Sequence, residues 1–340
     1  MNERATPDSR HDQVELSPKA LRDLCFRALH SAGASEELAD SMARATVEAE
    51  RRGRSSTGAS HLFGSVEALQ NGRLKRGPDP VVECRRAAII AVDADDGPAH
   101  LAFDRARDRL VTVARDTGIA MLGIERSYAW GELGYLACET ATQGLIAMAG
   151  TNSPALMSIF GAGVPVTGTN PFSFAVPSGV SRAGADEEAR PRLIDQASSE
   201  AAWVRVRSAA ERGEAIPEGW AVDAQGEPTT DPDEALAGAM LPFGGVKGAN
   251  IAVLVEVLGT LAGGAFSLDG TGPNDNPPRI GAWVIAIDPE AFGPGYIDRL
   301  DAHFERLEAF IGHDYGRRKP LLETIDIPRH VYDQLTADGQ

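Results

Sequence analysis

Residues 118–125, which read Gly-Ile-Ala-Met-Leu-Gly-Ile-Glu, decide the fold class of this chain. A short apolar run that begins at a glycine and ends at a charged residue is typical of a buried β-strand, and this run follows a helix-like stretch at 99–116. Strands that alternate with helices predict an α/β core. The other strand-like runs are 87–93, 145–152, 172–176, 192–195 and 282–288, and a second helix-like stretch is 132–143.

Two helices are expected before this core. Ser17 has the form of an N-cap followed by proline, and apolar residues then recur at helical spacing until Gly33. Ser35, followed by two glutamates, begins a second helix that ends near Gly53. Residues 1–14 are polar and charged without an apolar segment, so we expect a disordered tail there rather than a signal peptide.

Further segments follow the core. We expect a polar surface loop at 181–188, a helix at 201–212, and another helix in the apolar run from Ile251 to Phe266. Glu256 and three glycines interrupt that run, which is shorter than the roughly 20 apolar residues needed to cross a bilayer. The pattern predicts a buried helix that packs closely through its glycines.

Composition limits the possible partners. The chain has 340 residues, of which 43% are hydrophobic, enough for one large or two medium domains. Its formal charge of -16 opposes binding to nucleic acid or to an anionic membrane, so we expect a small-molecule substrate. Cys25, Cys84 and Cys138 lie far apart without a disulfide or metal-binding pattern, which favours a reducing cytoplasm and no metal site.

Common catalytic and nucleotide-binding motifs are missing from the sequence. No GxGxxG follows a predicted strand, and no GxxxxGK[ST], GxSxG or HExxH occurs. A Rossmann dinucleotide site or a P-loop therefore has no support. Composition and pattern alone indicate a soluble α/β protein of the enzyme class.

Five segments follow one another in the order and at the spacing of a known family. They are 52–53 with 66–72, 127–131 with 134–135, 151–154 with 168–171, 216–221 with 228–232, and 241–248. Through them the chain resembles the malate/L-lactate dehydrogenase family from Leu16 to Pro294. That family also includes sulfolactate, ureidoglycolate and piperideine-carboxylate dehydrogenases.

The resemblance implies a fold and a mode of action. Relatives have a non-Rossmann α/β fold, bind NAD or NADP in an extended groove, and work as homodimers with sites near the subunit interface. The expected parts are a helical N-terminal region at 15–80, a mixed-sheet cofactor-binding core at 81–245, and a C-terminal part at 246–340 that packs on the N-terminal region.

The resemblance also implies cofactor contacts. Serine hydroxyls and backbone amides bind ribose and phosphate oxygens, aspartate suits ribose hydroxyls, and lysine at a glycine-rich helix start suits phosphate. In the alternative interpretation Lys247 is a solvated charge and Asp195 belongs to a turn or cap. The Pro-Gly-Glu turn of relatives is missing between Tyr315 and Pro328. The expected contacts are Ser153, Asp195, Gln196, Ala197 and Lys247.

The pocket positions differ from those of relatives. Thr57 stands where relatives carry a histidine proposed as proton donor, and Ala129 replaces their second acid/base histidine. His61 occupies the position of the arginine that binds the substrate carboxylate, and Val246 replaces another histidine. The pocket residues that the resemblance implies are Ser56, Thr57, His61, Tyr128, Ala129, Trp130 and Val246.

These replacements argue against ordinary malate or lactate chemistry. Hydride reduction of a ketone leaves an alkoxide, and a positioned proton donor normally accelerates this step by about a hundredfold or more. Threonine and alanine cannot supply that proton, and neutral histidine is a poor substitute for the bidentate arginine.

Three hypotheses remain open. In the first, the substrate is a protonated cyclic imine that needs no general acid. In the second, Tyr128 or His61 is a new acid, although His61 could merely pack and Tyr128 and Trp130 could form the pocket wall or core. In the third, the scaffold no longer transfers hydride, which the missing Pro-Gly-Glu turn favours and Ser153 and Lys247 oppose. We favour a redox enzyme.

Overall fold

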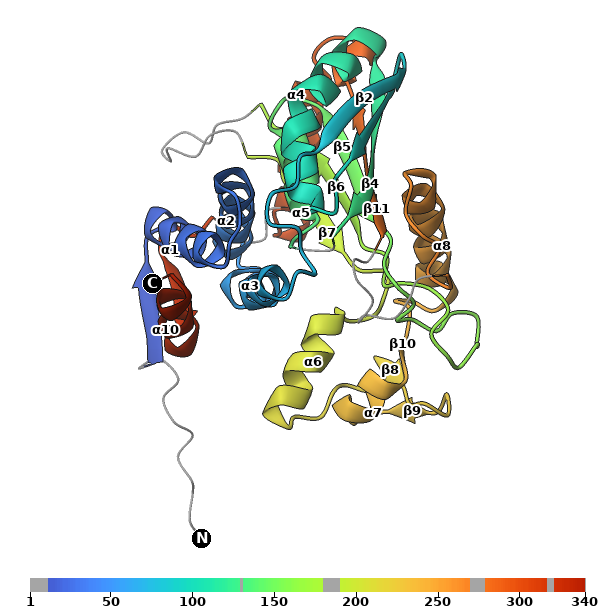
Figure 1. The fold of residues 1–340 in the computed structure, drawn as a ribbon. Helices are drawn as coiled ribbons and strands as arrows, with labels where there is room; N and C mark the ends of the chain where they lie inside the picture. The colour runs from blue at the N-terminus through green and yellow to red at the C-terminus, as the bar shows by residue number, and fades with distance from the viewer. Residues whose placement is uncertain (1–11, 129–130, 180–189, 270–278, 317–320, 340) are drawn as a thin grey trace. The chain divides into compact units, whose positions relative to one another are not determined.

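The computed structural model describes residues 12–128, 131–179, 190–269, 279–316 and 321–339, and the chain divides into two compact units (Figure 1). One unit comprises 1–77 with 319–340, and the other comprises 78–318. The loop expected at 181–188 lies outside the described residues. In the part of the chain that is described, no helix combines the length and apolar character needed to span a membrane.

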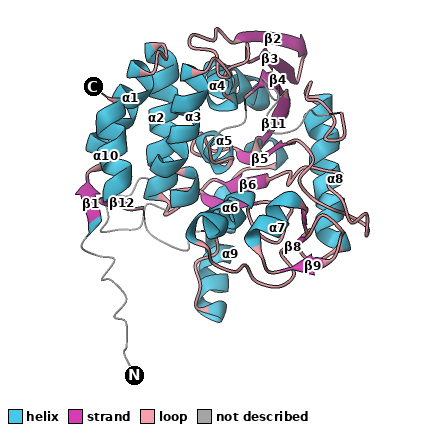
Figure 2. Cartoon of the chain, turned by 60° about the horizontal axis from the view of Figure 1, so that its bottom comes forward, coloured by secondary structure: helices cyan, strands magenta, loops and turns pink. Residues whose placement is uncertain are grey.

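The smaller unit consists mainly of helices. Helix α1 (Pro18–Ser31) packs against α2 (Glu36–Arg51), α3 (Leu62–Gln70) and α10 (Arg329–Asp338), as Figure 2 shows. The predicted caps are confirmed, because the hydroxyl of Ser17 accepts a hydrogen bond from Ala20 N and that of Ser35 accepts one from Leu38 N. Buried side chains on α1 and α2 follow the predicted helical spacing.

A two-stranded sheet corrects the expected N-terminal tail. Strand β1 (Gln13–Leu16) pairs antiparallel with β12 (Ile325–Pro328), so Gln13 and Val14 belong to a strand. The partner strand lies more than 300 residues away in the sequence. No local pattern could reveal this pairing.

The larger unit contains a seven-stranded mixed sheet in the order β2-β3-β4-β11-β5-β6-β7. Only β3 and β4 pair in parallel among these neighbours. The predicted mixed α/β core is confirmed. Strand β2 was missed because its residues are exposed on both faces and show no alternation. The strands are β2 (Val81–Arg86), β3 (Ile89–Asp93), β4 (Ile119–Ser127), β5 (Ile146–Thr151), β6 (Phe172–Val176), β7 (Arg192–Gln196) and β11 (Ile280–Ile287).

Helices cover both faces of this sheet. Figure 1 shows α4 (Ala99–Thr117) and α5 (Gly134–Ala141) on one face and α8 (Val246–Leu261) on the other. Along β4, Leu122 and Ile124 are buried, while a Cβ at Gly123 between them would lie 3.2 Å from Ala262 Cβ at the end of α8. The middle of the apolar run at 118–125 thus has a helix on each face, whereas Ile119 at its start is 48% exposed.

A smaller layer accompanies the sheet within this unit. It contains α6 (Trp203–Arg212), α7 (Pro232–Ala237) and the three-stranded sheet β10-β8-β9, which is formed by β8 (Ala221–Val222), β9 (Pro228–Thr229) and β10 (Ala239–Met240). Helix α9 (Tyr296–Ile311) follows β11. The buried cluster of this layer is Met157, Ala201, Val206, Ala209, Ile216, Ala221, Ala235, Met240 and Ala252.

The C-terminal boundaries differ from those expected. Residues 246–318 belong with the sheet, and only 319–340 belong with the N-terminal helices. The reason is β11, which lies between β4 and β5 as the central strand of the sheet. The proposed single part at 246–340 is therefore divided.

Helix α8 also differs from its prediction as a buried helix. Its glycines do pack closely, because a Cβ at Gly259 would lie 3.0 Å from both Asn152 Cβ and Gly281 O. Its other face, however, is exposed and apolar, with Val257 55% and Leu261 72% exposed. The apolar composition thus serves two different surfaces, of which the described residues cover only one.

We predict that Gly281→Ala destabilises the fold by about 3 kcal/mol, because overpacking a tight backbone contact has a cost of that order. A Cβ at Gly281 would lie 2.6 Å from Gly264 N and closer still to Gly259 O. Gly64→Ala is the matched control, since Gly64 lies in α3 with nothing within 4 Å, and it should stabilise by about 0.5 to 1 kcal/mol. Urea unfolding measures both, and a Gly281→Ala variant as stable as the parent would contradict the close approach of β11 and α8.

Candidate functional site

Ser198 joins two segments that carry predicted cofactor contacts to the loop before β6. Its N–H donates to Thr169 O at 2.8 Å, its hydroxyl donates to Asn170 O at 2.8 Å, and its carbonyl accepts from Phe243 N at 3.1 Å. Ser198 is 1% exposed. It therefore fixes the end of β7, the loop before β6 and the glycine turn before α8 beside one another.

Ser153 is held through its backbone. Its N–H donates to the side-chain oxygen of Asn170 at 3.2 Å, and its carbonyl accepts from the hydroxyl of Ser267 at 2.8 Å. Asn170 has φ of 34°, a left-handed conformation that asparagine tolerates better than most residues. At Gly168 a Cβ would lie 2.7 Å from Ser153 O, so only glycine fits there. Hydrogen bonding thus holds the segment at 152–153 and the segment at 168–171 together.

Asp195 lies on β7 opposite Ser173 of β6, with its side chain half-buried. A second carboxylate, missed in the sequence, lies close by. The position of a Cβ at Gly134 would be 3.1 Å from Glu132 Oε1 and 3.3 Å from Asp195 Oδ2. Glu132 is buried, and the two carboxylates approach the start of α5 together. Gln196 and Ala197 follow directly and lead into Ser198.

A buried histidine lies behind Glu132. The Nε2 of His100 forms a hydrogen bond with Glu132 O at 3.1 Å, and its ring lies 5.3 Å from the ring of Tyr135. Burial lowers the pKa of His100, although the hydrogen bond and Asp104 oppose this shift. The imidazole therefore serves as a neutral support for the backbone.

The glycine turn before α8 has room for a ligand. Gly244 and Gly245 have φ of 53° and 62°, which favour glycine, and a Cβ at either would meet nothing within 4 Å. Lys247 and Val246 in the first helical turn are both exposed. An open glycine turn, a helix N-terminus and a cation together fit a phosphate group.

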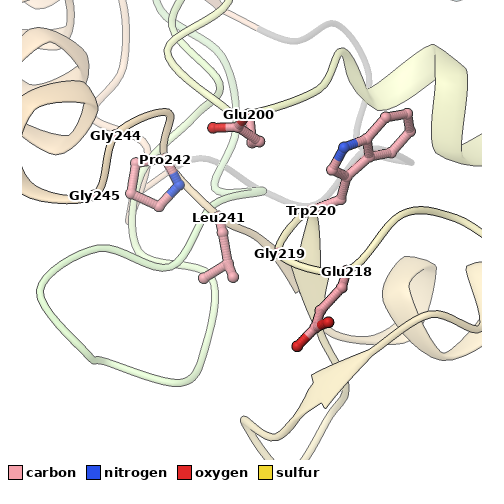
Figure 3. A pocket seen from close by; sticks show the side chains of 8 residues that line it. All are labelled: Glu200, Glu218, Gly219, Trp220, Leu241, Pro242, Gly244 and Gly245. Atoms are coloured by element: carbon pink, nitrogen blue, oxygen red, sulfur yellow. The ribbon is translucent and has the colours of Figure 1, made fainter.

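A pocket of about 440 Å³ adjoins this turn (Figure 3). Figure 3 shows Glu200, Glu218 and Trp220 around it, and the guanidinium of Arg205 lies 4.4 Å from the centre of the Trp220 ring. Among the described residues, the lining contains two carboxylates and no cationic side chain, so it suits hydroxyl groups better than phosphate. The lining residues are Glu200, Glu218, Gly219, Trp220, Leu241, Pro242, Gly244 and Gly245.

The predicted catalytic residues of the smaller unit share one turn. Ser56 and Thr57 lie on the 3-10 helix η2 (Ser55–Thr57), and His61 ends η3 (Ala59–His61). Thr57 donates its hydroxyl to Arg54 O at 3.2 Å, and both Thr57 and His61 are half-buried. The structure thus brings Thr57 and His61 together on one loop.

Glu50 holds this loop from beneath. Its carboxylate accepts the N–H of Ala59 at 2.7 Å, and Gly58 has no room for a Cβ against it. Burial raises the pKa of Glu50, and burial together with Glu50 raises the pKa of the neighbouring Cys25 to about 12. No sequence pattern indicated this contact, because Glu50 lies in an ordinary helical pattern.

Tyr128 is positioned by the turn after β4. Its N–H donates to Gly97 O at 2.8 Å, and its side chain is half-buried. The preceding Arg126 has φ of 53° and pairs with Asp93, Asp95 and Asp96. Ala129 and Trp130 lie outside the described residues. Among the described residues, no group of three or more His, Cys, Asp or Glu side chains could hold a metal ion.

Comparison with known proteins shows which family this chain resembles. Residues 16–316 match the family model described as Malate/L-lactate dehydrogenase. The chain is 35% identical to a (2R)-3-sulfolactate dehydrogenase (NADP(+)) from Chromohalobacter salexigens over 95% of this chain and 97% of that protein. It is also 35% identical to a Delta(1)-pyrroline-2-carboxylate reductase from Ancylobacter novellus, over 91% and 89%.

A solved structure agrees with these similarities. The delta1-piperideine-2-carboxylate reductase from Pseudomonas syringae pv. tomato superposes with a TM-score of 0.88 at 33% identity, over 96% of this chain and 99% of that one. The family match and the relatives, which are named dehydrogenases and reductases, define an NAD(P)-dependent oxidoreductase. This chain belongs to the malate/L-lactate dehydrogenase family.

We predict that the stability of Glu50→Gln relative to the parent protein increases as the pH rises. Because burial raises the pKa of Glu50 above its ordinary value of 4.5, the folded state binds this proton more tightly than the unfolded state. The carboxyl's contribution is complete below pH 4.5 and is lost as the pH rises through the raised pKa. Glutamine does not titrate but still accepts from Ala59.

Urea unfolding between about pH 4.5 and pH 8 measures this difference. Glu67→Gln is the control, since Glu67 is exposed on α3. A difference between Glu50→Gln and the parent that stays constant over this range would contradict the titration of Glu50.

Proposed function

We propose that this protein reduces the C=N bond of a small cyclic imino acid with NADH or NADPH. The observation that carries this proposal is the turn at 55–61, which offers Thr57, tied to Arg54 O, at the position where a ketone reductase of this family is expected to hold a titrating histidine. The names of two similar proteins, a pyrroline-2-carboxylate reductase and a piperideine-2-carboxylate reductase, support this substrate class.

Reduction of a protonated imine needs no acid from the protein. Hydride adds to the imine carbon, the C=N π electrons move to nitrogen, and the proton already on the nitrogen remains in the amine product. The nicotinamide cofactor supplies the hydride when it is bound. The protein's task is therefore to bind, orient and exclude water rather than to donate a proton.

In this proposal each predicted residue has a role in binding. Ser153 and the adjoining backbone contact ribose or phosphate. Asp195 accepts hydrogen bonds from ribose hydroxyls, and Lys247 forms an ion pair with phosphate. The pocket beside the glycine turn accepts an uncharged, hydroxyl-bearing part of the cofactor, because Glu200 and Glu218 repel phosphate. By resemblance, His61 takes the position of the residue that binds the substrate carboxylate, and Tyr128 and Val246 take positions of pocket residues in relatives.

A second candidate is reduction of a small carbonyl compound. The similarity to a sulfolactate dehydrogenase favours it. In that case Tyr128 or His61 supplies the proton that Thr57 cannot. If the protein binds neither NADH nor NADPH, a scaffold that no longer transfers hydride would be favoured instead.

We predict that Lys247→Ala weakens NADH or NADPH binding by about 1.5 to 3 kcal/mol, the range of a charge-assisted hydrogen bond. Arg207→Ala is the matched control, because it removes one exposed cation from α6 in the same unit and should leave binding unchanged. Calorimetry measures both. Equal affinities of the two variants would remove Lys247 from the cofactor site.

We also predict that the parent protein reduces pyruvate or oxaloacetate negligibly and reduces a cyclic imine readily. Thr57→His with His61→Arg should then restore a proton donor and a carboxylate-binding cation together. These neighbours should couple, so the gain in keto acid reduction should exceed the product of the single gains. If the double variant binds NADH and reduces no keto acid, even with Ala129→His added, the assignment of the pocket positions is wrong.

A homodimer is part of the proposal. Val253, Val257 and Leu261 follow one another at helical spacing on the exposed face of α8, and an apolar stripe of this kind is typical of a subunit contact. Val257→Glu should therefore shift the mass measured by light scattering from dimer to monomer. Val164→Glu, which alters another exposed valine, should not. A monomeric parent protein at micromolar concentration would contradict the dimer.

We further propose that the protein works in a reducing cytoplasm. Cys25, Cys84 and Cys138 are all free thiols, and two of them are buried. A reducing compartment keeps the exposed thiol of Cys84 from oxidation.

A further inference from the structure

Glu256 is the one charged side chain between residues 248 and 268 of the sequence. Its carboxylate accepts three hydrogen bonds from outside its own helix. One comes from the hydroxyl of Thr167, one from Asn170 Nδ2 at 3.2 Å, and one from Ser267 N at 3.0 Å. A carboxylate in this apolar helix thus collects donors from two loops.

Two of these three donors belong to residues that hold Ser153. Asn170 accepts the Ser153 N–H, and Ser267 donates to the Ser153 carbonyl. Glu256 therefore lies behind both hydrogen bonds that fix the peptide groups on either side of Ser153. No other described side chain bonds to both Asn170 and Ser267.

The donor and acceptor roles in these three hydrogen bonds require a side chain at position 256 that only accepts. An ionised carboxylate cannot donate, so it orients the Asn170 amide with its NH2 toward Glu256 and its oxygen toward Ser153. The carbonyl of Ala252 also accepts from Asn170 Nδ2, at 2.9 Å, which favours the same orientation. Asn170 is 0% exposed, so water cannot replace a lost partner without a change in packing.

We propose that Glu256 is the positioning residue for cofactor binding at Ser153, acting through Asn170 and Ser267. The inference rests on the proposed function in one respect, the cofactor contact of Ser153. It assigns to Glu256 the task of presenting the Ser153 hydroxyl and backbone in a fixed geometry. Cofactor affinity therefore depends on the hydrogen-bond polarity at position 256 and not only on the stability of α8.

Glu256→Gln tests this proposal, because the NH2 group of the introduced glutamine would face one of the groups that now donate to Glu256. We expect about a tenfold weaker affinity for NADH or NADPH, measured by fluorescence titration, with KM for the second substrate unchanged. Glu290→Gln is the matched control, since it removes one exposed carboxylate from the same unit and should leave the affinity unchanged.

A compensating pair separates positioning from stability. In Glu256→Gln with Asn170→Asp the donor and acceptor are exchanged, so the introduced glutamine amide donates to the introduced carboxylate, which still accepts from Ser153 N. Both variants that carry Asn170→Asp lose the hydrogen bond to Ala252 O, so they are compared with each other. Asn170→Asp alone also brings two carboxylates together, and we expect the double variant to bind the cofactor more tightly than Asn170→Asp alone. A Glu256→Gln variant with the parent affinity, or a double variant that binds no better than Asn170→Asp alone, would overturn the proposal.

The failure of the proposed function gives a different result. If the parent protein binds neither nucleotide, the cofactor role of Ser153 is lost and this inference is lost with it. Hydrogen exchange at the Ser153 amide separates the two cases, because Glu256→Gln should reduce its protection whether or not a nucleotide binds. Unchanged protection in Glu256→Gln would contradict the inference even if the parent protein binds NADH.

Discussion

The contact between the central strand of the sheet and the end of α8 determines much of the larger unit. Asn152 connects the two, since its Oδ1 accepts from Gly281 N at 2.9 Å and its Nδ2 donates to Ala265 O at 2.6 Å. The backbone of β11 and α8 can approach this closely only because Gly259, Gly264 and Gly281 lack side chains. The residue after Asn152 is Ser153, so the same contact positions the predicted cofactor serine.

The polar groups around Ser153 extend this contact into a buried network. Such a network rigidifies a site only when all its members are satisfied. Here Glu256, Asn170 and Ser267 supply complementary donors and acceptors, and Ser198 attaches the end of β7 and the glycine turn. The fold thus builds its cofactor side from loops that are fixed by side chains, in place of the glycine-rich strand-to-helix turn of a Rossmann fold.

The sequence predicted helices and strands correctly where their buried side chains recur at a regular spacing. The apolar runs at 118–125 and 145–152 are strands in the sheet, and the capped helices at Ser17 and Ser35 begin where expected. It failed where the deciding contact is distant, as for β1, or where apolar residues serve an exposed surface, as for Leu261. Motif resemblance identified Ser153 and Lys247 as candidates. Glu256, Ser198 and Glu132 lie outside the interpreted motifs, because their importance comes from neighbours that only the folded chain provides.

We propose that this family member transfers hydride to a cyclic imine without a protein acid. The most direct measurement uses NADH or NADPH with deuterium at the transferable position and 1-pyrroline-2-carboxylate as acceptor. Mass spectrometry of the cyclic amino acid product should show one deuterium on the former imine carbon, with Thr57→Ala as active as the parent protein. An unlabelled product, or no product under conditions where the nucleotide binds, would contradict hydride transfer from the cofactor to the imine carbon.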